Sequence, residues 1–328
     1  MKYKNFEEAY IENLRETYCN PEFENSPRGY KSRERLNCTI EIENPIERVC
    51  YLPARKENII FNFAEAIWYL SGSNSLEFID YYASNMKKYS ADGKTLKGTA
   101  YGPKIFTFGS NAINQWNRLI DIFKEDPDTK RGFVQIFDAN EDLHLTNIDV
   151  SCTIGLQFFQ RKNALYTCGY MRANDAYRGI VSDVFSFTFI QEMLATQMGL
   201  KVGRYYHNIA TTHVYEPDNQ HVERILVDSI HDTVSKFCFP TMPHKNNWDD
   251  LKVVLEYEEL LRNKKIELSI EKLNKIGIDN YWKQLLLLFS IYQGIYYNNK
   301  IEFHLYKYLY PVYQHFVKNR WSEMLKEA

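Results

Sequence analysis

Four side chains with complementary chemistry stand in the middle of this chain. Cys152 is followed by Arg172, Asp183 and His213, which lie 20, 31 and 61 residues further on. A thiolate can add to an electron-poor ring carbon, and a guanidinium binds phosphate oxygens in pairs. A carboxyl group and an imidazole can hydrogen-bond a base and a sugar. The set therefore indicates a site that holds a nucleotide and attacks its base.

Each of these residues also has a structural interpretation without chemistry. A lone cysteine is more often an inert buried side chain than a nucleophile, and this rule does not separate Cys152 from Cys168. Asp183 precedes the apolar run VFSF, where the N-cap of a helix would stand. His213 and Tyr215 fit a strand with one buried and one exposed polar residue. Residue types alone leave both interpretations open.

The composition predicts a globular protein with a large core. Of the 328 residues, 45% are hydrophobic and 25% are charged, which suits a chain that folds without disulfides. The net charge of −2 gives no basic field for nucleic acid, so a small anionic ligand held by a few arginines is favoured. The six cysteines form no CxxC pair, and no histidines stand at metal-ligand spacing, so we expect reduced thiols and no metal.

The start of the chain and its hydropathy bear on location. The first 18 residues are charged and amphipathic, unlike a signal peptide, and no run of 18 apolar residues occurs. We therefore expect a cytoplasmic protein that binds neither membrane nor nucleic acid.

Hydrophobic periodicity predicts an α+β chain with one sheet and one long buried helix. The segments 20–35 and 90–104, which are rich in polar residues, Gly and Pro, are expected to be irregular. Strands are expected at 38–42, 132–137, 153–160, 164–170 and 205–215. Helices are expected at 6–18, 58–70, 74–85, 113–124, 184–198, 217–230, 248–263 and 280–298.

Three stretches, DVSCTIGLQFFQ, MRANDAYRGIVSD and TTHVYEP, resemble the thymidylate synthase family, and within it the cytidylate hydroxymethylase branch. The resemblance covers most of residues 1–240, is most specific over 149–216 and fades after about 250. It implies a single thymidylate synthase-like domain over 1–328, with one large mixed sheet packed with helices around a long buried helix. It also implies a homodimer formed through one face of the sheet. The co-substrate that it implies is 5,10-methylenetetrahydrofolate, which becomes tetrahydrofolate.

The resemblance assigns Cys152 as the nucleophile that adds to C6 of a pyrimidine. The Gln that the family carries five residues after its cysteine is Gln157 here, while Thr153 stands where the family usually has His. Nearby arginines are expected to lower the pKa of the Cys152 thiol.

The resemblance also assigns a phosphate clamp. Arg172 matches the family's phosphate-binding arginine, and Arg28 matches an arginine of a flexible loop, with Arg33 as the alternative. Lys130 and Arg131 match two arginines that family members donate across the dimer interface. Lys130 departs from that pair, because an ammonium group cannot bind two phosphate oxygens as a guanidinium does.

Asp183 stands where family members that act on uracil carry Asn. Cytosine has an acceptor at N3 and a donor at N4, and a protonated carboxyl group can match both. Burial would have to raise the pKa of Asp183 for this role. The resemblance adds Asn174 to the substrate-binding residues and assigns His213 and Tyr215 to the sugar. Ala173 replaces a family Ser and, with Lys130, hints at a site adjusted for a 2′-hydroxyl, so CMP is favoured over dCMP.

The helix FAEAIWYL resembles the family helix that carries the catalytic glutamate, which here is Glu65. Tyr101 matches a tyrosine that helps to remove the C5 proton. Met86 and Tyr89 stand where synthases carry two tryptophans, one of which shields the intermediate from water. The absence of the shielding tryptophan and the charged end WSEMLKEA favour addition of water to the intermediate over its reduction. The folate-facing residues that the resemblance implies are Trp68, Met86, Tyr89, Asp175 and Gly179.

These inferences together predict a CMP 5-hydroxymethylase, a role that the resemblance connects with nucleoside-antibiotic biosynthesis. The alternatives are a dCMP hydroxymethylase and then a thymidylate synthase. A member of another class would bind a nucleotide or an RNA for regulation and would need no nucleophile.

Overall fold

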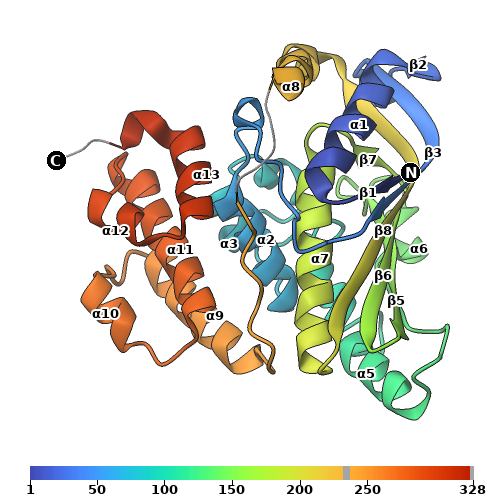
Figure 1. Ribbon diagram of the computed structural model, residues 1–328. Helices are drawn as coiled ribbons and strands as arrows, with labels where there is room; N and C mark the ends of the chain where they lie inside the picture. The colour runs from blue at the N-terminus through green and yellow to red at the C-terminus, as the bar shows by residue number, and fades with distance from the viewer. Residues whose placement is uncertain (232–236, 326–328) are drawn as a thin grey trace.

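The computed structural model describes residues 1–231 and 237–325, and within them a single mixed sheet is the central layer (Figure 1). Its strand order is β1-β3-β8-β6-β5-β4, with β2 paired to β3 and β7 paired to β8. The pairs β1–β3, β6–β8 and β7–β8 are parallel, and the others are antiparallel. The strands are β1 (Lys2–Tyr3), β2 (Phe23–Asn25), β3 (Ser32–Ile42), β4 (Phe133–Gln135), β5 (Thr153–Arg161), β6 (Ala164–Met171), β7 (Asn174–Asp175) and β8 (Lys201–Tyr215).

The helices flank the sheet and form a further group beside it. Short 3₁₀ turns η1 (Pro27–Gly29) and η3 (Met86–Tyr89) matter for the site described below. The α-helices are α1 (Phe6–Cys19), α2 (Ile59–Leu70), α3 (Leu76–Tyr82), α4 (Tyr101–Phe106), α5 (Gln115–Glu125), α6 (Ala139–Asp142), α7 (Gly179–Gln197), α8 (Asn219–His231), α9 (Trp248–Arg262), α10 (Ile270–Lys275), α11 (Asn280–Asn298), α12 (Phe303–Tyr308) and α13 (Pro311–Trp321).

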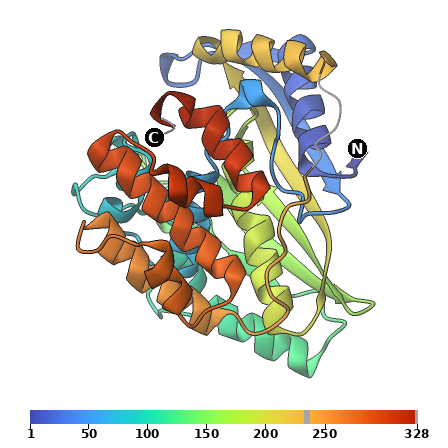
Figure 2. The same ribbon diagram turned by 60° about the vertical axis from the view of Figure 1, so that its left-hand side comes forward.

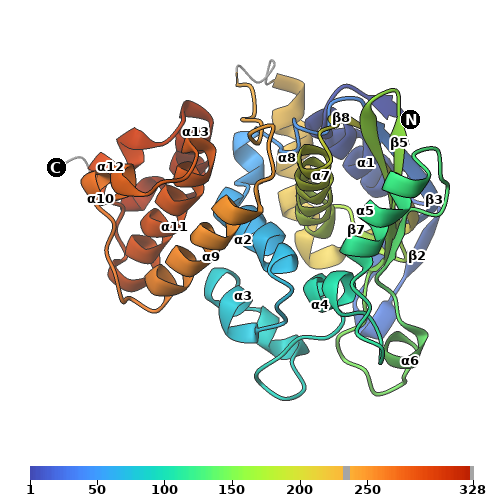
Figure 3. The same ribbon diagram turned by 90° about the horizontal axis from the view of Figure 1, so that it is seen from below.

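Helix α7 is the long buried helix that the sequence predicts. It packs against β6 and β8 on one side and against α2 on the other, and Figure 3 shows it nearly end-on between these layers. Residues from Val184 to Thr196 are all buried. A helix that is apolar around its whole circumference is stable only when neighbours cover every side. The expected α+β fold with one large mixed sheet is therefore confirmed.

The sheet has one covered and one open face. Along β6 the buried residues Leu165 and Thr167 alternate with the partly exposed Tyr166 and Cys168, as the two-residue period of a strand requires. Ile154 on β5 is also exposed. Within one chain this outer face remains available for a partner.

The helices α9 to α13 form a separate group on the far side of α2 from the sheet, orange to red in Figure 2. Helix α11 packs against α9, α12 and α2, and α13 also packs against α2. The charged segment 321–328 begins at the end of α13, and its residues from 326 on lie outside the described part of the chain.

Three local expectations were wrong. The segment 20–35 is not wholly irregular, because β2 and the start of β3 lie within it and pair with each other. The segment 90–104 contains the start of α4, which begins at Tyr101. Asp183 is not an N-cap, because α7 starts at Gly179 and its N-cap is Arg178. Asp183 is therefore a carboxyl group in the second turn of a buried helix, where an apolar residue would be ordinary.

Candidate active site

Cys152 lies at the entrance to β5, beside the end of β6. The backbone N–H of Arg172 donates to the carbonyl of Cys152 at 2.7 Å, which fixes the two strand ends together. The Arg172 side chain then folds back, with Nε donating to the carbonyl of Ser151 at 3.2 Å. Its Nη2 lies 3.9 Å from Cys152 Sγ. The structure therefore brings together the thiol and the cation that the sequence separates by 20 residues.

The turn that precedes Cys152 is locked by Asp149. This buried carboxylate accepts hydrogen bonds from the backbone N–H groups of Lys97, Gly98 and Thr99 at 2.8, 2.9 and 3.0 Å. Ser151 Oγ donates to the carbonyl of Gly98 at 2.9 Å. A Cβ atom at Gly98 would lie 1.8 Å from the Asp149 carbonyl oxygen, so only glycine permits this approach. The position of Cys152 thus depends on the segment 97–99.

The electrostatics at Cys152 differ from the expectation. The residue is open to solvent on one side, yet the protein around it raises the pKa of the thiol to about 11. Burial is the largest cause, and the nearby carboxyl group of Asp183 adds to it, since both disfavour the thiolate. Arg172 and Arg28 act in the expected direction, but they are outweighed. The expectation was thus right about the arginines, while the net shift of the thiol pKa is upward.

Two buried carboxyl groups have pKa values near neutrality. Burial raises the pKa of Asp183 to about 7, against the opposing effect of a hydrogen bond from Asn174. Burial, followed by the charge of Asp183, raises the pKa of Glu65 on α2 to about 8. Ser186 Oγ donates to Glu65 at 3.1 Å. Groups of this kind hold and release protons at neutral pH, as general acids and bases must.

Two tyrosines connect the Cys152 strand to Glu65. Thr153 Oγ1 donates to the hydroxyl of Tyr101 at 2.9 Å, and the Tyr101 ring stacks on Tyr69 with the ring centres 4.7 Å apart. Tyr69 in turn hydrogen-bonds Glu65. Tyr69 was missed in the sequence, although it stands four residues after Glu65 and so lies on the same face of the helix.

Arg28 and His213 lie at the other end of the cluster. Arg28 has a left-handed backbone (φ 54°) in η1, and its positive charge acts on the pKa of both Cys152 and His213. The alternative, Arg33, instead donates to the carbonyl of Tyr18 at 3.0 Å and lies 4.3 Å over its ring. Burial is the largest cause that lowers the pKa of His213, and the charge of Asp175 opposes it.

The sugar pair is adjacent in space. The rings of His213 and Tyr215 at the end of β8 lie 4.8 Å apart and meet nearly edge to face. Ala173 is partly buried in the turn between β6 and β7, directly after Arg172.

A buried hydrogen-bonded row lies behind Asp183. Asn174 Nδ2 donates to Asp183 Oδ2 at 2.7 Å, and Asn174 Oδ1 lies 2.8 Å from His207 Nε2. His207 Nδ1 lies 2.7 Å from the hydroxyl of Tyr205. Tyr205 and His207 were missed in the sequence, where their spacing of two on a strand was the available signal.

Asp175 and Gly179 stand at the entrance of α7. The Asp175 carboxylate accepts from the backbone N–H groups of Tyr177 and Arg178, both at 2.8 Å. Gly179 lies so close to Asn174 that a Cβ atom there would be 3.3 Å from Asn174 Nδ2.

Other residues that the sequence assigned to the site lie apart from this cluster. Lys130 and Arg131 are exposed on the turn between α5 and β4, and no described contact joins either side chain to Cys152. Gln157 points to the outer side of the sheet, where it donates to the carbonyl of Lys130 at 2.8 Å and accepts from the Tyr170 hydroxyl at 3.0 Å. In a single chain these three residues are therefore not brought to the thiol.

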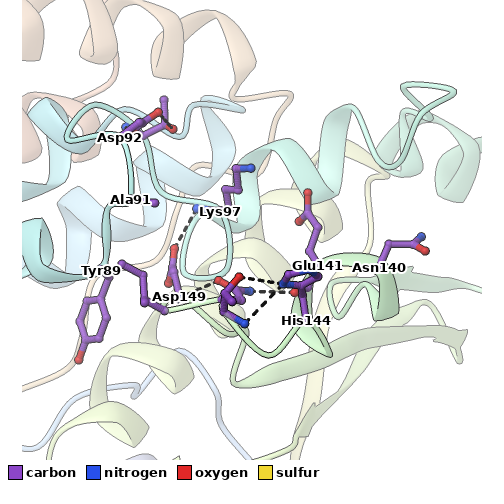
Figure 4. Close-up of a pocket in the computed structure, with 12 residues that line it drawn as sticks. Tyr89, Ala91, Asp92, Lys97, Asn140, Glu141, His144 and Asp149 are labelled. Atoms are coloured by element: carbon purple, nitrogen blue, oxygen red, sulfur yellow. Dashed lines mark hydrogen bonds between the residues drawn. The ribbon is translucent and has the colours of Figure 1, made fainter.

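The folate-facing candidates divide in the same way. Trp68 is completely buried, and its indole N–H has no hydrogen-bond partner among the described residues. Met86 packs against the core, whereas Tyr89 lines a cavity of about 470 Å³. Figure 4 shows this cavity between the segment with Tyr89 and Lys97 and the segment with His144 and Asp149. It adjoins the turn that carries Cys152.

Within residues 1–231 and 237–325, no group of three or more His, Cys, Asp or Glu side chains is arranged to hold a metal ion. None of the helices described is long and apolar enough to cross a membrane.

Comparison with known proteins gives one family. The thymidylate synthase family model matches residues 8–275. A deoxyuridylate hydroxymethyltransferase of Bacillus phage SP01 is 29% identical over 261 residues, which are 76% of this chain and 65% of the relative. A protein of the same name in Delftia phage PhiW-14 is 30% identical over 202 residues, with 58% and 55% covered.

A thymidylate synthase of Leuconostoc mesenteroides is 31% identical over 119 residues, which are 36% of this chain and 35% of the relative. The chain thus spans less than two thirds of the length of each of these relatives.

Proposed function

Since the chain belongs to the thymidylate synthase family, we propose that it is a CMP 5-hydroxymethylase. It would transfer a one-carbon unit from 5,10-methylenetetrahydrofolate to C5 of the nucleotide, and addition of water would give 5-hydroxymethyl-CMP. The observation that carries this proposal is the carboxyl group of Asp183, which shares one site with Cys152 and has a pKa of about 7. At a pH near this pKa a large share of the Asp183 side chains carry a proton, and a protonated carboxyl group can hydrogen-bond N3 of cytosine.

The base would lie between the thiol and this acid. A protonated oxygen of Asp183 donates to N3, and the other oxygen accepts from the N4 amino group. Arg172 and Arg28 supply the positive charge for the phosphate, and His213 and Tyr215 hydrogen-bond the sugar. The absence of a hydroxyl at Ala173 leaves room beside the sugar, which supports CMP over dCMP.

The residues of the cluster would then act in sequence. The Cys152 thiolate adds to C6 while Asp183 passes its proton to N3, and the ring becomes nucleophilic at C5. 5,10-Methylenetetrahydrofolate would supply the one-carbon unit that C5 receives, and tetrahydrofolate would leave as the C–N bond to that unit breaks. Tyr101 and Glu65 take part in removing the C5 proton, and Glu65 orients the water that adds to the new carbon. Asp183 recovers its proton as the thiolate leaves C6.

The cavity of about 470 Å³ beside the Cys152 turn supports a place for the folate. Its volume lies within the range of small-molecule sites. Tyr89 offers an aromatic surface there, and the nearby Met86 replaces an indole that would exclude water. Water therefore reaches the intermediate, which supports hydroxymethyl transfer over methyl transfer. The printed names of two relatives point to the same reaction type.

A homodimer would complete the phosphate site. Lys130 and Arg131 lie at the edge of the open sheet face and are free to reach a second chain.

A folate-dependent enzyme is also favoured over a regulatory nucleotide- or RNA-binding protein, because a protein that only binds gains nothing from a thiol and two acids with near-neutral pKa values.

Deoxyuridylate hydroxymethyl transfer is the second candidate, since two relatives carry that name. The oxygen of Asp183 that holds the acidic proton would distinguish the two candidates, because uracil has a donor at N3 where cytosine has an acceptor.

The test is release of tritium from C5-labelled nucleotides with methylenetetrahydrofolate. Release from [5-³H]CMP is the expected result. Release from the labelled dCMP alone would move the assignment to the deoxynucleotide, and release from dUMP alone would support the second candidate. No release from any pyrimidine nucleotide would favour the regulatory protein.

A further inference from the structure

The hydrogen-bonded row behind Asp183 is buried along its whole length. Tyr205 and His207 are fully buried on β8, and Asn174 is 2% exposed on β7. Asn174 bridges from His207 to Asp183, and both of its hydrogen bonds are shorter than 3 Å. Water cannot substitute for any member of such a row, so each donor must find its acceptor within it.

The direction of the hydrogen bonds follows from the chemistry of the two ends. His207 is neutral, because burial lowers its pKa to about 3, so one ring nitrogen donates and the other accepts. Since Asn174 Nδ2 donates to Asp183, Asn174 Oδ1 must accept from His207 Nε2–H. His207 Nδ1 must then accept from the hydroxyl of Tyr205. Every donor in the row points towards Asp183.

The opposite direction is disfavoured by the Tyr205 end. It would require a rotated Asn174 amide and a Tyr205 hydroxyl that accepts from His207. Among the described residues the hydroxyl hydrogen of Tyr205 then has no other acceptor, and an unpaired buried donor is destabilising.

Two glycines make room for the row. A Cβ atom at Gly169 on β6 would lie 2.5 Å from the Tyr205 hydroxyl, and one at Gly179 would lie 3.3 Å from Asn174 Nδ2 and 3.5 Å from Asp183 Oδ2. The row thus depends on small residues of two further elements, β6 and α7.

The direction of the row matters because a protonated carboxyl group is ambiguous. With the proton on one oxygen it offers a donor at N3 and an acceptor at N4, as cytosine requires. With the proton on the other oxygen it offers the reverse pattern, which suits uracil. An acid alone therefore does not choose between the two bases, and some other group must fix which oxygen holds the proton.

We propose that Asn174, His207 and Tyr205 are positioning residues that keep Asp183 Oδ2 as an acceptor and so place the acidic proton on Oδ1, which selects cytosine over uracil. This inference rests on the proposed function, because it assumes that Asp183 faces the base. Tyr205 and His207 do not need to touch the substrate. Asn174 touches it only where its side chain borders the base.

The experiment compares dissociation constants for CMP and UMP by calorimetry in variants at the far end of the row. Tyr205→Phe removes the hydroxyl that fixes the His207 tautomer, and we expect the preference for CMP to fall about tenfold. His207→Leu is expected to lower the preference at least as far. His207→Gln, which keeps one donor and one acceptor, is expected to restore part of it.

Tyr313→Phe is the matched control. Tyr313 is also fully buried, and its hydroxyl has no hydrogen-bond partner among the described residues, so this variant should keep the wild-type ratio. The quantity compared is the ratio of the dissociation constants for UMP and CMP. If this ratio is the same in Tyr205→Phe and His207→Leu as in Tyr313→Phe, and CMP is still preferred, the inference is overturned while the proposed function stands. A wild-type protein that prefers UMP would overturn the proposed function as well. A variant that fails to fold is recognised by circular dichroism. The preference for CMP over UMP in His207→Gln then replaces the measurement on that variant.

Discussion

At the scale of single residues, the surroundings of Cys152 on balance disfavour its thiolate. Burial and Asp183 raise the pKa of the thiol to about 11, although two arginines act against them. The thiolate fraction at neutral pH is therefore small, and oxidation and alkylation both proceed through the thiolate.

This state predicts the pH dependence of alkylation. Because the pKa is raised, the thiolate fraction at pH 7 is very small, and the rate with iodoacetamide should rise about tenfold for each pH unit from 7 to 10. Mass spectrometry of the peptide that contains Cys152 measures this rate. A plateau near pH 8 would show that Arg172 and Arg28 outweigh burial.

Asp183→Asn tests the reading of the base. An amide offers a fixed donor and acceptor, and Asn174 can still hydrogen-bond its oxygen. Tritium release should shift from CMP towards UMP or dUMP, with at least about a tenfold change in the ratio of kcat/KM values. Thr188→Val on the same helix is the control, since its hydroxyl bonds only carbonyls within α7. An unchanged preference for cytosine would mean that another group reads the base.

Some of the properties of single site residues could be predicted from the sequence. It singled out Cys152 and Arg172, which the structure places 3.9 Å apart, and it anticipated a raised pKa for Asp183. It gave the direction in which the arginines shift the pKa of Cys152 but not the net result, because the pKa is a sum over burial and charges that only the folded chain brings together. It missed His207 for the same reason, since the residue acts through partners 33 positions away.

At the scale of elements, the turn before β5 depends on one carboxylate. Asp149 satisfies three backbone N–H groups of the segment 97–99, and this segment has no helix or strand of its own. The placement of Cys152 and of one wall of the adjoining cavity therefore follows from Asp149.

Asp149→Ala should lower the free energy of unfolding by about 3 kcal/mol, because buried N–H groups lose a charged acceptor. Urea denaturation measures this change. Asp92→Ala is the matched control: Asp92 also accepts from two backbone N–H groups, but in an exposed loop where water can replace it. Equal effects of the two substitutions would contradict the role of burial.

Helices and strands with a clear hydrophobic pattern in the sequence were predictable. Elements that are ordered only by contacts with distant parts of the chain were not. The apolar run that forms α7 was recognised, apart from its first turn from Gly179. Strand β2 was missed because its three residues are all exposed and are ordered only by pairing with β3. The same limit hid the start of α4, a six-residue helix whose Gly102 lies against the backbone of Tyr69 and Gly72.

At the scale of the whole molecule, the open face of the sheet is the feature that one chain leaves unexplained. Lys130 and Arg131 lie at its edge, away from Cys152, although the family resemblance assigns them to a phosphate site. A two-fold dimer through this face would bring the pair of one chain to the thiol of the other.

Mixing two inactive variants tests this arrangement. Arg131→Ala lacks the donated cation and Cys152→Ala lacks the nucleophile, so a mixed dimer should contain one complete site. Random exchange of subunits should restore about a quarter of the wild-type activity, since half of the dimers are mixed and each has one working site. No recovery, with exchange shown by differently tagged chains, would place Arg131 and Cys152 of the same chain in one site.

The sequence did not predict how the helices α9 to α13 are placed relative to the rest of the chain. The resemblance fades after about 250, and the family model ends at residue 275. The structure nevertheless packs α11 and α13 of this group against α2, the element that carries Glu65.

The mass of the nucleotide product separates hydroxymethyl transfer to CMP from the other reactions of this family. Purified protein is incubated with CMP and methylenetetrahydrofolate, and the nucleotide is measured by mass spectrometry, with Cys152→Ala as the control. The account predicts a nucleotide heavier by one CH₂O unit that requires Cys152. A product formed only from dUMP, or one heavier by CH₂ alone, would contradict it.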